Sequence, residues 1–186
     1  MLAYNEITQK KYIELDGEPY EVIASHVFRK QQRKPVNQTK LRNLITGSVT
    51  ERSFGASEKA HEAQLETQDI QYIYEHRGSY WFSLPQDPKT RFELPPTLLG
   101  NERRFLKEGL VIQSVRFKGE IIGVRFPIKV ELKVTDAPPA VRGNTAQGGN
   151  KQVTLESGAV ISAPLFINTG DTLRINTETG EYVERA

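Results

Sequence analysis

Short stretches in which apolar and polar residues alternate recur along the chain, and β-branched and aromatic residues are frequent in them. An alternation with a period of two residues predicts half-buried β-strands. Glycine-containing pairs separate these stretches and supply the positive φ angles that tight hairpin turns need. The clearest pairs are Asp16-Gly17, Gly47-Ser48, Gly78-Ser79, Lys118-Gly119 and Thr179-Gly180. The pattern therefore predicts an all-β protein made of small barrels or sandwiches.

Residues 96–109, with the sequence PTLLGNERRFLKEG, depart from this alternation. Leu98, Leu99, Glu102, Phe105 and Leu106 follow helical spacing in this segment. The segment begins after prolines and stops at Gly109, and glycine is favoured just beyond a helix end. We expect one short helix here, packed on a barrel.

Two changes in the pattern indicate where the chain divides. The polar stretch ASEKAHEA, residues 56–63, separates two groups of predicted strands. Pro127 interrupts the strand-like run IIGVRFPIKVELKV, because proline lacks the amide proton that a central strand would use. We predict three β modules in tandem, at residues 1–63, 64–127 and 128–186. Modules of this size have modest cores, so we expect docking of the second module on the third to add stability.

Composition removes several classes of protein. The chain of 186 residues has no cysteine, which excludes disulfides, cysteine-ligated zinc and a thiol nucleophile. The N-terminus lacks a signal-like apolar core, and no stretch approaches the roughly 20 apolar residues of a membrane span. His26, His61 and His76 do not have metal-binding spacing, and no acid-base pair stands out. Several classes of enzyme are thereby excluded, and we expect a cytoplasmic protein without metal, cofactor or membrane partner.

The charge is unevenly distributed, although the net charge is only +2. Residues 27–43, VFRKQQRKPVNQTKLRN, hold six basic residues and no acidic one, on what the pattern predicts to be a β-hairpin with its tip near Gln31-Gln32. A few such charges protect an exposed strand from edge-to-edge pairing. Six exceed that need, and a positive patch of this kind favours contact with the phosphates of a nucleic acid.

The segment RGNTAQGGNK, residues 142–151, has Gly143 and Gly148 at the spacing of a phosphate-binding loop. That motif continues with lysine and then serine or threonine, whereas Gly149 and Asn150 follow here, so the nucleotide-binding interpretation fails. A loop between strands is the simpler interpretation, and close approach of a partner's backbone is the functional one.

The sequence resembles the bacterial elongation factor P family over essentially its whole length. LDGEPYEVIAS with TKLRNLITGSVTERSF is similar to the first domain of that family. Residues from VTDAPPAVRGNTAQGGNK to the C-terminus resemble the third domain. Its signature is matched by Lys151, Gly158, Ala159, Pro164, Leu165, Phe166 and Gly170. The resemblance implies an SH3-like or Tudor-like (KOW-like) first domain, two OB-fold domains and an L-shaped outline like that of a tRNA.

The resemblance also implies a function. Members of the family are translation factors without catalytic groups that enter the 70S ribosome between the P and E sites and relieve stalling at consecutive prolines. They hold the P-site peptidyl-tRNA in a productive geometry while the ribosome carries out the chemistry, which is catalysis by positioning. The implied partners are both ribosomal subunits, the P-site tRNA and the E-site codon of the mRNA, and the implied state is a monomer.

The family's hairpin runs along the acceptor arm of the P-site tRNA. The matching residues here are Arg29, Lys30, Gln31, Gln32, Arg33, Lys34, Lys40 and Arg42. Many members carry a modified lysine or arginine between glycines at the tip, but an ungapped count puts Gln32 at that position. Two interpretations follow. In one, the modification moves to Lys30, Arg33 or Lys34. In the other, which we favour because the glycines and proline that mark the loop are absent, the protein works unmodified. A divergent paralogue with an altered role is a third possibility.

The resemblance gives the glycine-rich loop a role near the E-site codon on the small subunit. Its residues are Gly143, Asn144, Thr145, Ala146, Gln147, Gly148 and Gly149. Asn144 replaces a residue that is commonly acidic. Tyr182 and Arg185 match residues that face the small subunit, with core packing as the alternative for Tyr182.

Two other functions fit the residues. A ribosome-independent RNA-binding protein would stack bases on exposed aromatics, but we expect Tyr72, Tyr74, Tyr80, Trp81 and Phe82 to fill a core. A protein-interaction scaffold would use the SH3-like module.

Overall fold

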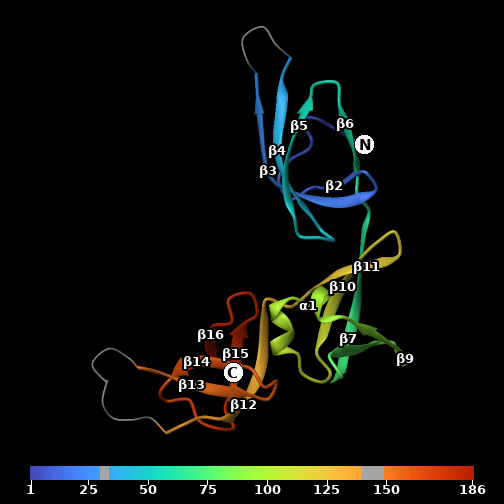
Figure 1. Cartoon of the computed structure of the whole chain (residues 1–186). Helices are drawn as coiled ribbons and strands as arrows, with labels where there is room; N and C mark the ends of the chain where they lie inside the picture. The colour runs from blue at the N-terminus through green and yellow to red at the C-terminus, as the bar shows by residue number, and fades with distance from the viewer. Residues whose placement is uncertain (30–33, 140–148) are drawn as a thin grey trace. The chain divides into compact units, whose positions relative to one another are not determined.

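The computed structural model describes residues 1–29, 34–139 and 149–186. These residues form two compact units, Met1–Gln68 with Val115–Gly123, and Asp69–Ser114 with Val124–Ala186. Three β-sheets contain most of the regular structure (Figure 1). The all-β prediction is therefore confirmed.

The first sheet has six strands in the order β1-β6-β2-β3-β4-β5. Its strands are β1 (Leu2–Ala3), β2 (Tyr12–Leu15), β3 (Glu18–Phe28), β4 (Val36–Asn43), β5 (Val49–Gly55) and β6 (Lys59–Glu62). The apolar side chains that they turn inward meet in one cluster with Ile7. The cluster consists of Ile7, Ile13, Val22, Leu41, Phe54 and Ala60. The sheet curls around this core as a small SH3-like barrel.

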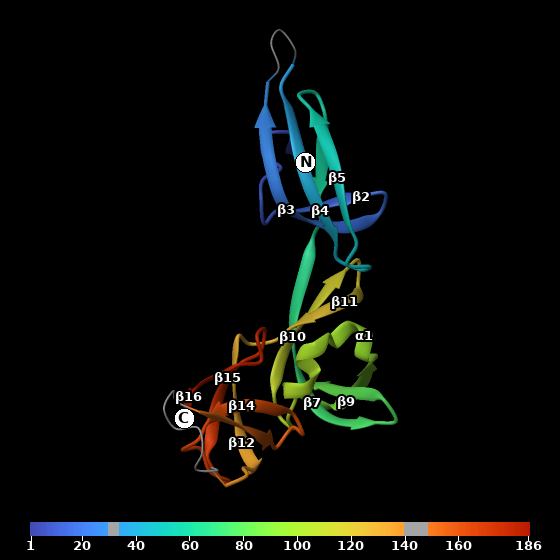
Figure 2. The same ribbon diagram turned by 60° about the vertical axis from the view of Figure 1, so that its left-hand side comes forward.

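Strands β3 and β4 extend farther than the rest of this barrel. β3 pairs with β2 only between Glu18 and Glu21, but it pairs with β4 from Tyr20 to Phe28. The register shifts between Val22 and Ala24, which is where β3 leaves the barrel core. Figures 1 and 2 show β3 and β4 side by side along this length. The predicted basic hairpin is therefore a long ribbon, flanked on one side by β5.

Three tight turns explain how short strands are joined. Asp16-Gly17, Arg77-Gly78 and Lys118-Gly119 each have positive φ at both residues, between 51° and 86°. Two central residues with positive φ are the signature of the type I′ turn, whose twist matches that of the flanking strands. The turn predicted at Gly78-Ser79 lies one residue earlier, because Arg77 takes the left-handed conformation and Ser79 already begins a strand.

The second sheet has five strands in the order β11-β10-β7-β8-β9. They are β7 (Leu65–His76), β8 (Ser79–Leu84), β9 (Asp87–Leu94), β10 (Val111–Phe117) and β11 (Glu120–Arg125). Ile70, Phe82, Leu94 and Ile112 are buried along them. Strands β7, β10 and β11 contribute residues to both compact units.

The helix expected over residues 96–109 is wrong in its extent. The α-helix α1 covers only Pro96–Leu99, and a 3₁₀-helix η1 follows at Asn101–Phe105. Gly100 between them has φ 64° and ψ −160°, a conformation that ends the α-helix and that glycine adopts readily. Leu99 and Phe105 are nevertheless both buried, as the helical spacing indicated.

The third sheet has five strands in the order β14-β13-β12-β15-β16. They are β12 (Lys129–Asp136), β13 (Asn150–Leu155), β14 (Val160–Pro164), β15 (Thr172–Asn176) and β16 (Tyr182–Arg185). Alternate residues of β12 are buried, and Val130, Leu132 and Val134 join the core of this barrel. Phe105 of η1 belongs to the same core cluster and is fully buried.

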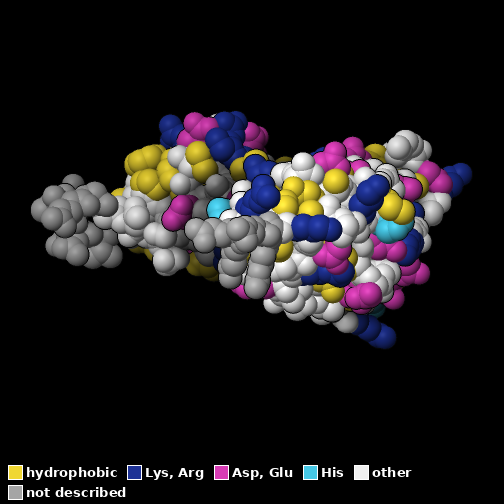
Figure 3. All heavy atoms as spheres, turned by 90° about the horizontal axis from the view of Figure 1, so that it is seen from above, with side chains coloured by type: hydrophobic (Ala, Val, Ile, Leu, Met, Phe, Trp, Pro, Cys, Tyr) yellow, Lys and Arg dark blue, Asp and Glu magenta, His cyan; other side chains and the backbone are white. Residues whose placement is uncertain are grey.

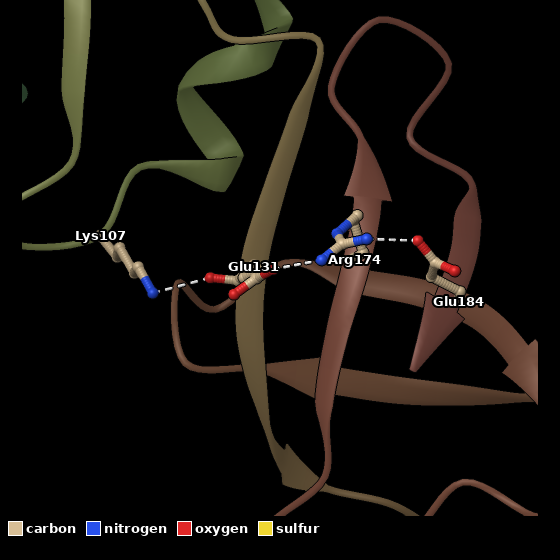
Figure 4. A network of polar contacts seen from close by, with 4 residues as sticks. All are labelled: Lys107, Glu131, Arg174 and Glu184. Carbon is tan, nitrogen blue, oxygen red and sulfur yellow. Dashed lines mark hydrogen bonds and ion pairs between the residues drawn. The ribbon is translucent and has the colours of Figure 1, made fainter. Parts of the chain in front are cut away.

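Polar contacts reinforce the third sheet and its junction with the second. Lys107 Nζ, just after η1, donates to the backbone oxygen of Glu131 on β12 at 2.7 Å (Figure 4). Arg174 on β15 bridges two carboxylates, donating to Glu131 at 2.7 Å and to Glu184 on β16. These hydrogen bonds raise the pKa of Arg174. They link β15 to its two neighbours, β12 and β16. Phe105 and Lys107 therefore tie the second sheet to the third within one compact unit.

Candidate nucleic-acid interface

Four of the predicted hairpin contacts lie among the described residues. Arg29 directly follows β3, Lys34 lies just before β4, and both are exposed. Lys40 and Arg42 lie on β4 itself, also exposed. Lys30, Gln31, Gln32 and Arg33, including every candidate for modification except Lys34, lie outside the described residues.

The alternation of β4 sorts its side chains between two faces. Gln38, Lys40 and Arg42 are exposed, while Asn37, Thr39, Leu41 and Asn43 are buried. Successive residues of a strand point to opposite faces, so the two cations share one solvent-facing surface. Lys40 and Arg42, the two predicted contact residues on β4, are therefore both accessible to solvent.

The expectation that these charges are uncompensated is wrong for Arg42. Its Nη2 lies 2.5 Å from Glu21 Oε2 on β3, because Arg42 and Glu21 are directly paired in the sheet. Lys40 is opposite Glu51 on β5 in the strand register. Figure 3 shows the same mixture more widely, with Lys and Arg interspersed among Asp and Glu on the visible face. Glu21 and Glu51 come from the neighbouring strands and therefore lie outside the basic stretch of sequence.

Sequence reasoning missed the buried polar residues behind this surface. Asn37 is fully buried, and its Nδ2 donates to the backbone oxygens of Tyr4 at 2.6 Å and Ile7 at 2.8 Å. Asn43 Nδ2 donates to Glu18 at 2.6 Å, and Asn43 Oδ1 accepts the backbone N–H groups of Ile45 and Thr46. These bonds fix the N-terminal segment and the β4–β5 turn. The signal was a polar residue at three of the four inward positions of β4, Asn37, Thr39 and Asn43.

The second predicted contact, the glycine-rich loop, is described only at its end. Gly143, Asn144, Thr145, Ala146, Gln147 and Gly148 lie outside the described residues. Gly149 leads into β13, where Lys151 Nζ donates to the backbone oxygen of Pro138 at 2.9 Å. This bond joins the two chain segments on either side of the loop.

Tyr182 and Arg185, the remaining predicted contacts, both lie on β16. Tyr182 is half-buried and packs against the core of the third barrel, as the alternative interpretation held. It also lines a groove of about 410 Å³ with Asn150, Ser162 and Pro164, among other residues. Arg185 is exposed near the end of the chain.

The aromatic residues of β7 and β8 are only partly a core. Phe82 is fully buried, and Tyr72 meets it edge-on with ring centroids 5.5 Å apart. Burial, with Glu75 and Tyr80 nearby, raises the pKa of Tyr72. Tyr74, however, stacks on Trp81 with centroids 6.1 Å apart and is 42% exposed. The expectation of core packing is therefore wrong for Tyr74.

No metal-binding group of His, Asp and Glu occurs among the residues that the structure describes. The same residues include no helix with the length and apolar character needed to cross a membrane.

Comparison with known families matches both ends of the chain. The family described as "Elongation factor P (EF-P) KOW-like domain" matches residues 4–60, and "Elongation factor P, C-terminal" matches residues 130–185. The first match contains the described part of the basic hairpin, and the second contains most of the third sheet.

Full-length relatives are also similar. The chain is 38% identical over 185 residues to elongation factor P of Carboxydothermus hydrogenoformans and 39% identical over 186 residues to that of Moorella thermoacetica. Both alignments cover 100% of this chain and 100% of the relative.

Solved structures share the fold at low identity. A eukaryotic translation initiation factor 5A from Methanococcus jannaschii superposes with a TM-score of 0.52 and 16% identity, covering 66% of this chain and 94% of that chain. An initiation factor 5A family protein from Naegleria fowleri gives a TM-score of 0.50 and 12% identity, covering 67% of this chain and 96% of that chain.

Proposed function

The chain belongs to the elongation factor P family and is a translation elongation factor, and from this premise we propose how it acts. It binds the ribosome between the P and E sites as a monomer in the cytoplasm. There it stimulates peptide-bond formation at runs of proline by positioning the P-site peptidyl-tRNA. This role needs no catalytic group, cofactor or metal of its own, because restraining the reactants lowers the entropic part of the barrier while the ribosome carries out the chemistry.

The observation that carries this proposal is the β3–β4 ribbon. It extends beyond its barrel and bears Arg29, Lys34 and Lys40 as exposed cations on a chain that matches the family from end to end. A narrow basic ribbon suits insertion along an RNA backbone, where each neutralised phosphate releases counterions. Arg42 contributes less, since Glu21 already neutralises it.

The third barrel supplies the second contact in this proposal. The loop at residues 143–149, together with Tyr182 and Arg185, faces the E-site codon and the small subunit. The half-burial of Tyr182 against the core supports a role in holding β16, with Arg185 as the contacting group.

We further propose that the protein acts without modification of its hairpin tip. Gln32, at the position that an ungapped count assigns to the modified lysine or arginine of many family members, carries neither an amine nor a guanidinium. In this mechanism Gln32 supplies hydrogen bonds, and the neighbouring basic residues supply charge.

The test is single-round peptide-bond formation on ribosomes paused at a Pro-Pro-Pro run, with protein produced in the absence of any modifying enzyme. We expect the unmodified protein to raise the rate, and Lys34→Gln with Lys40→Gln to abolish most of the gain. Lys59→Gln, an exposed lysine on β6 of the same barrel, is the matched control and leaves the rate unchanged. If the unmodified protein binds ribosomes but does not change the rate, the proposed unmodified mechanism is wrong.

A further inference from the structure

The β3–β4 ribbon carries an aromatic pair in addition to its cations. His26 and Phe28 are two residues apart on β3 and therefore lie on the same face. Their rings are stacked, with centroids 6.2 Å apart and an angle of 16° between the planes. His26 is exposed and Phe28 is half-buried. Both lie beyond Glu21, the last residue at which β3 pairs with β2, so this pair is not part of the barrel core.

The cross-strand neighbours of these rings are aliphatic, amide or small residues. Phe28 is opposite Val36 on β4, and Val36 is opposite Gly55 on β5. His26 is opposite Gln38, which in turn is opposite Ser53. Each of these two rows begins with an aromatic ring on β3, continues with an aliphatic or amide side chain on β4, and ends with glycine or serine on β5. A planar ligand can therefore lie against them.

Charged groups border this surface on different sides. Lys40 is exposed on the same face, two cross-strand pairs farther along than Gln38. Arg29 directly follows Phe28, and Lys34 lies two residues before Val36. At the β5 side, Glu58 Oε2 accepts the Gly55 backbone N–H at 2.5 Å. That carboxylate repels phosphate but accepts a hydrogen bond from an amino group.

Aromatic rings bordered by cations are the recurrent feature of proteins that bind single-stranded nucleic acid, because every base has a π-face and each linkage a phosphate. A site for phosphates alone needs no exposed rings. A surface for an apolar protein partner gains nothing from cations beside the rings. The combination on this face therefore favours RNA with an unpaired base.

We propose that the His26–Phe28 pair is a stacking platform for one unpaired nucleobase of the RNA that this hairpin contacts. The inference rests on the proposed function and adds to it a contact with a base, where the cations bind only the backbone. Gln38 and Glu58 supply hydrogen-bonding groups at the edges of the platform, so a base with an exocyclic amino group fits better than uracil.

The test uses the full chain and an RNA hairpin whose short single-stranded tail contains one 2-aminopurine, a base whose fluorescence falls on stacking. The wild-type protein is expected to quench the fluorescence saturably. Phe28→Leu keeps an apolar side chain but removes the ring, so we expect it to abolish the quenching and weaken binding by roughly tenfold. Phe28→Tyr restores both. Thermal unfolding of each variant establishes that the fold is intact.

Lys40→Gln separates stacking from charge. This variant is expected to bind more weakly and with a shallower salt dependence, but to quench fully at saturation. A second RNA tests the preference for an amino group: replacing the other bases of the tail by uracil is expected to weaken the binding of wild-type protein.

The outcomes distinguish this inference from the proposed function. In one outcome, wild-type protein and Phe28→Leu accelerate Pro-Pro-Pro synthesis equally, and neither quenches the 2-aminopurine fluorescence. The platform is then wrong and the proposed function stands. If quenching depends on Phe28 but synthesis is not accelerated, the platform stands and the proposed function is wrong. Absence of any binding of wild-type protein to the RNA probe at low salt also overturns the platform.

Discussion

Asn37 occupies an inward position of β4 where the alternation calls for an apolar residue. Its side-chain amide bonds the backbone oxygens of Tyr4 and Ile7, which belong to the segment before β2. We expect Asn37→Ala to destabilise the first barrel by about 1–3 kcal/mol, because two acceptors lose a buried donor. Urea unfolding measures the loss, and hydrogen exchange at residues 4–8 locates it. Gln38→Ala, on the exposed face of the same strand, changes stability by at most about 0.5 kcal/mol; an equal effect of both would contradict the assignment.

Asp87 is a second residue whose local bonds have a measurable consequence. Thr90 Oγ1 donates to its carboxylate at 2.5 Å and the Lys89 backbone N–H does so at 3.2 Å, and these bonds lower the pKa of Asp87. A lowered pKa means that this carboxylate contributes stability above its ordinary pKa of 3.8, and that the contribution is lost as the pH falls through the lowered value. We expect Thr90→Val to raise the Asp87 pKa toward 3.8, as measured by NMR titration of the carboxyl carbon. An unchanged titration would show that the backbone bonds alone are sufficient.

At the scale of elements, an ion pair on the β3–β4 ribbon competes with the binding of this ribbon to RNA phosphates. Arg42 and Glu21 form an exposed ion pair, and such pairs contribute at most about 1 kcal/mol to stability. Glu21→Gln removes the competing carboxylate at little cost to the fold. We therefore expect it to strengthen binding to ribosomes several-fold and to steepen the salt dependence, as measured by co-sedimentation at two salt concentrations. Glu62→Gln on β6, which removes the ion-pair partner of Lys11, is the matched control. Equal effects of both variants would mean that only net charge matters.

The elements show what local sequence can predict. Turns such as Asp16-Gly17 and Lys118-Gly119 were identified because their glycines report a backbone requirement that involves no distant residue. The segment after Pro95 was harder to predict, because its apolar spacing fits a continuous helix. Gly100 breaks that helix, and the 3₁₀ turn that follows directs Phe105 into the core of a different barrel. Which barrel receives a buried side chain depends on tertiary packing, and the spacing of Leu99 and Phe105 carries no such information.

At the scale of the whole molecule, the candidate site was predictable where its residues are contiguous. The exposed cations Arg29, Lys34 and Lys40 were identified because they fall in one stretch without acids. The ion pair of Arg42 with Glu21 was not, because it depends on the register of β3 against β4, which shifts between Val22 and Ala24. Direct pairing decides which charges cancel, and register cannot be read from a single strand.

The packing of Phe105 leads to a prediction about how the larger part of the chain unfolds. This ring belongs to η1, yet it lies in the core formed by β12 to β15, and Lys107 nearby bonds the backbone of β12. We expect Phe105→Ala to cost about 3–5 kcal/mol, since a fully buried ring leaves a cavity. Its effect should reach the third sheet, lowering hydrogen-exchange protection at Leu132 and Ile175 as well as around η1. Leu99→Ala, a buried neighbour from α1 that is not part of that core cluster, is the comparison and should affect the third sheet less. If Phe105→Ala leaves the protection of Leu132 and Ile175 unchanged, the two sheets unfold independently, and the shared core does not couple them.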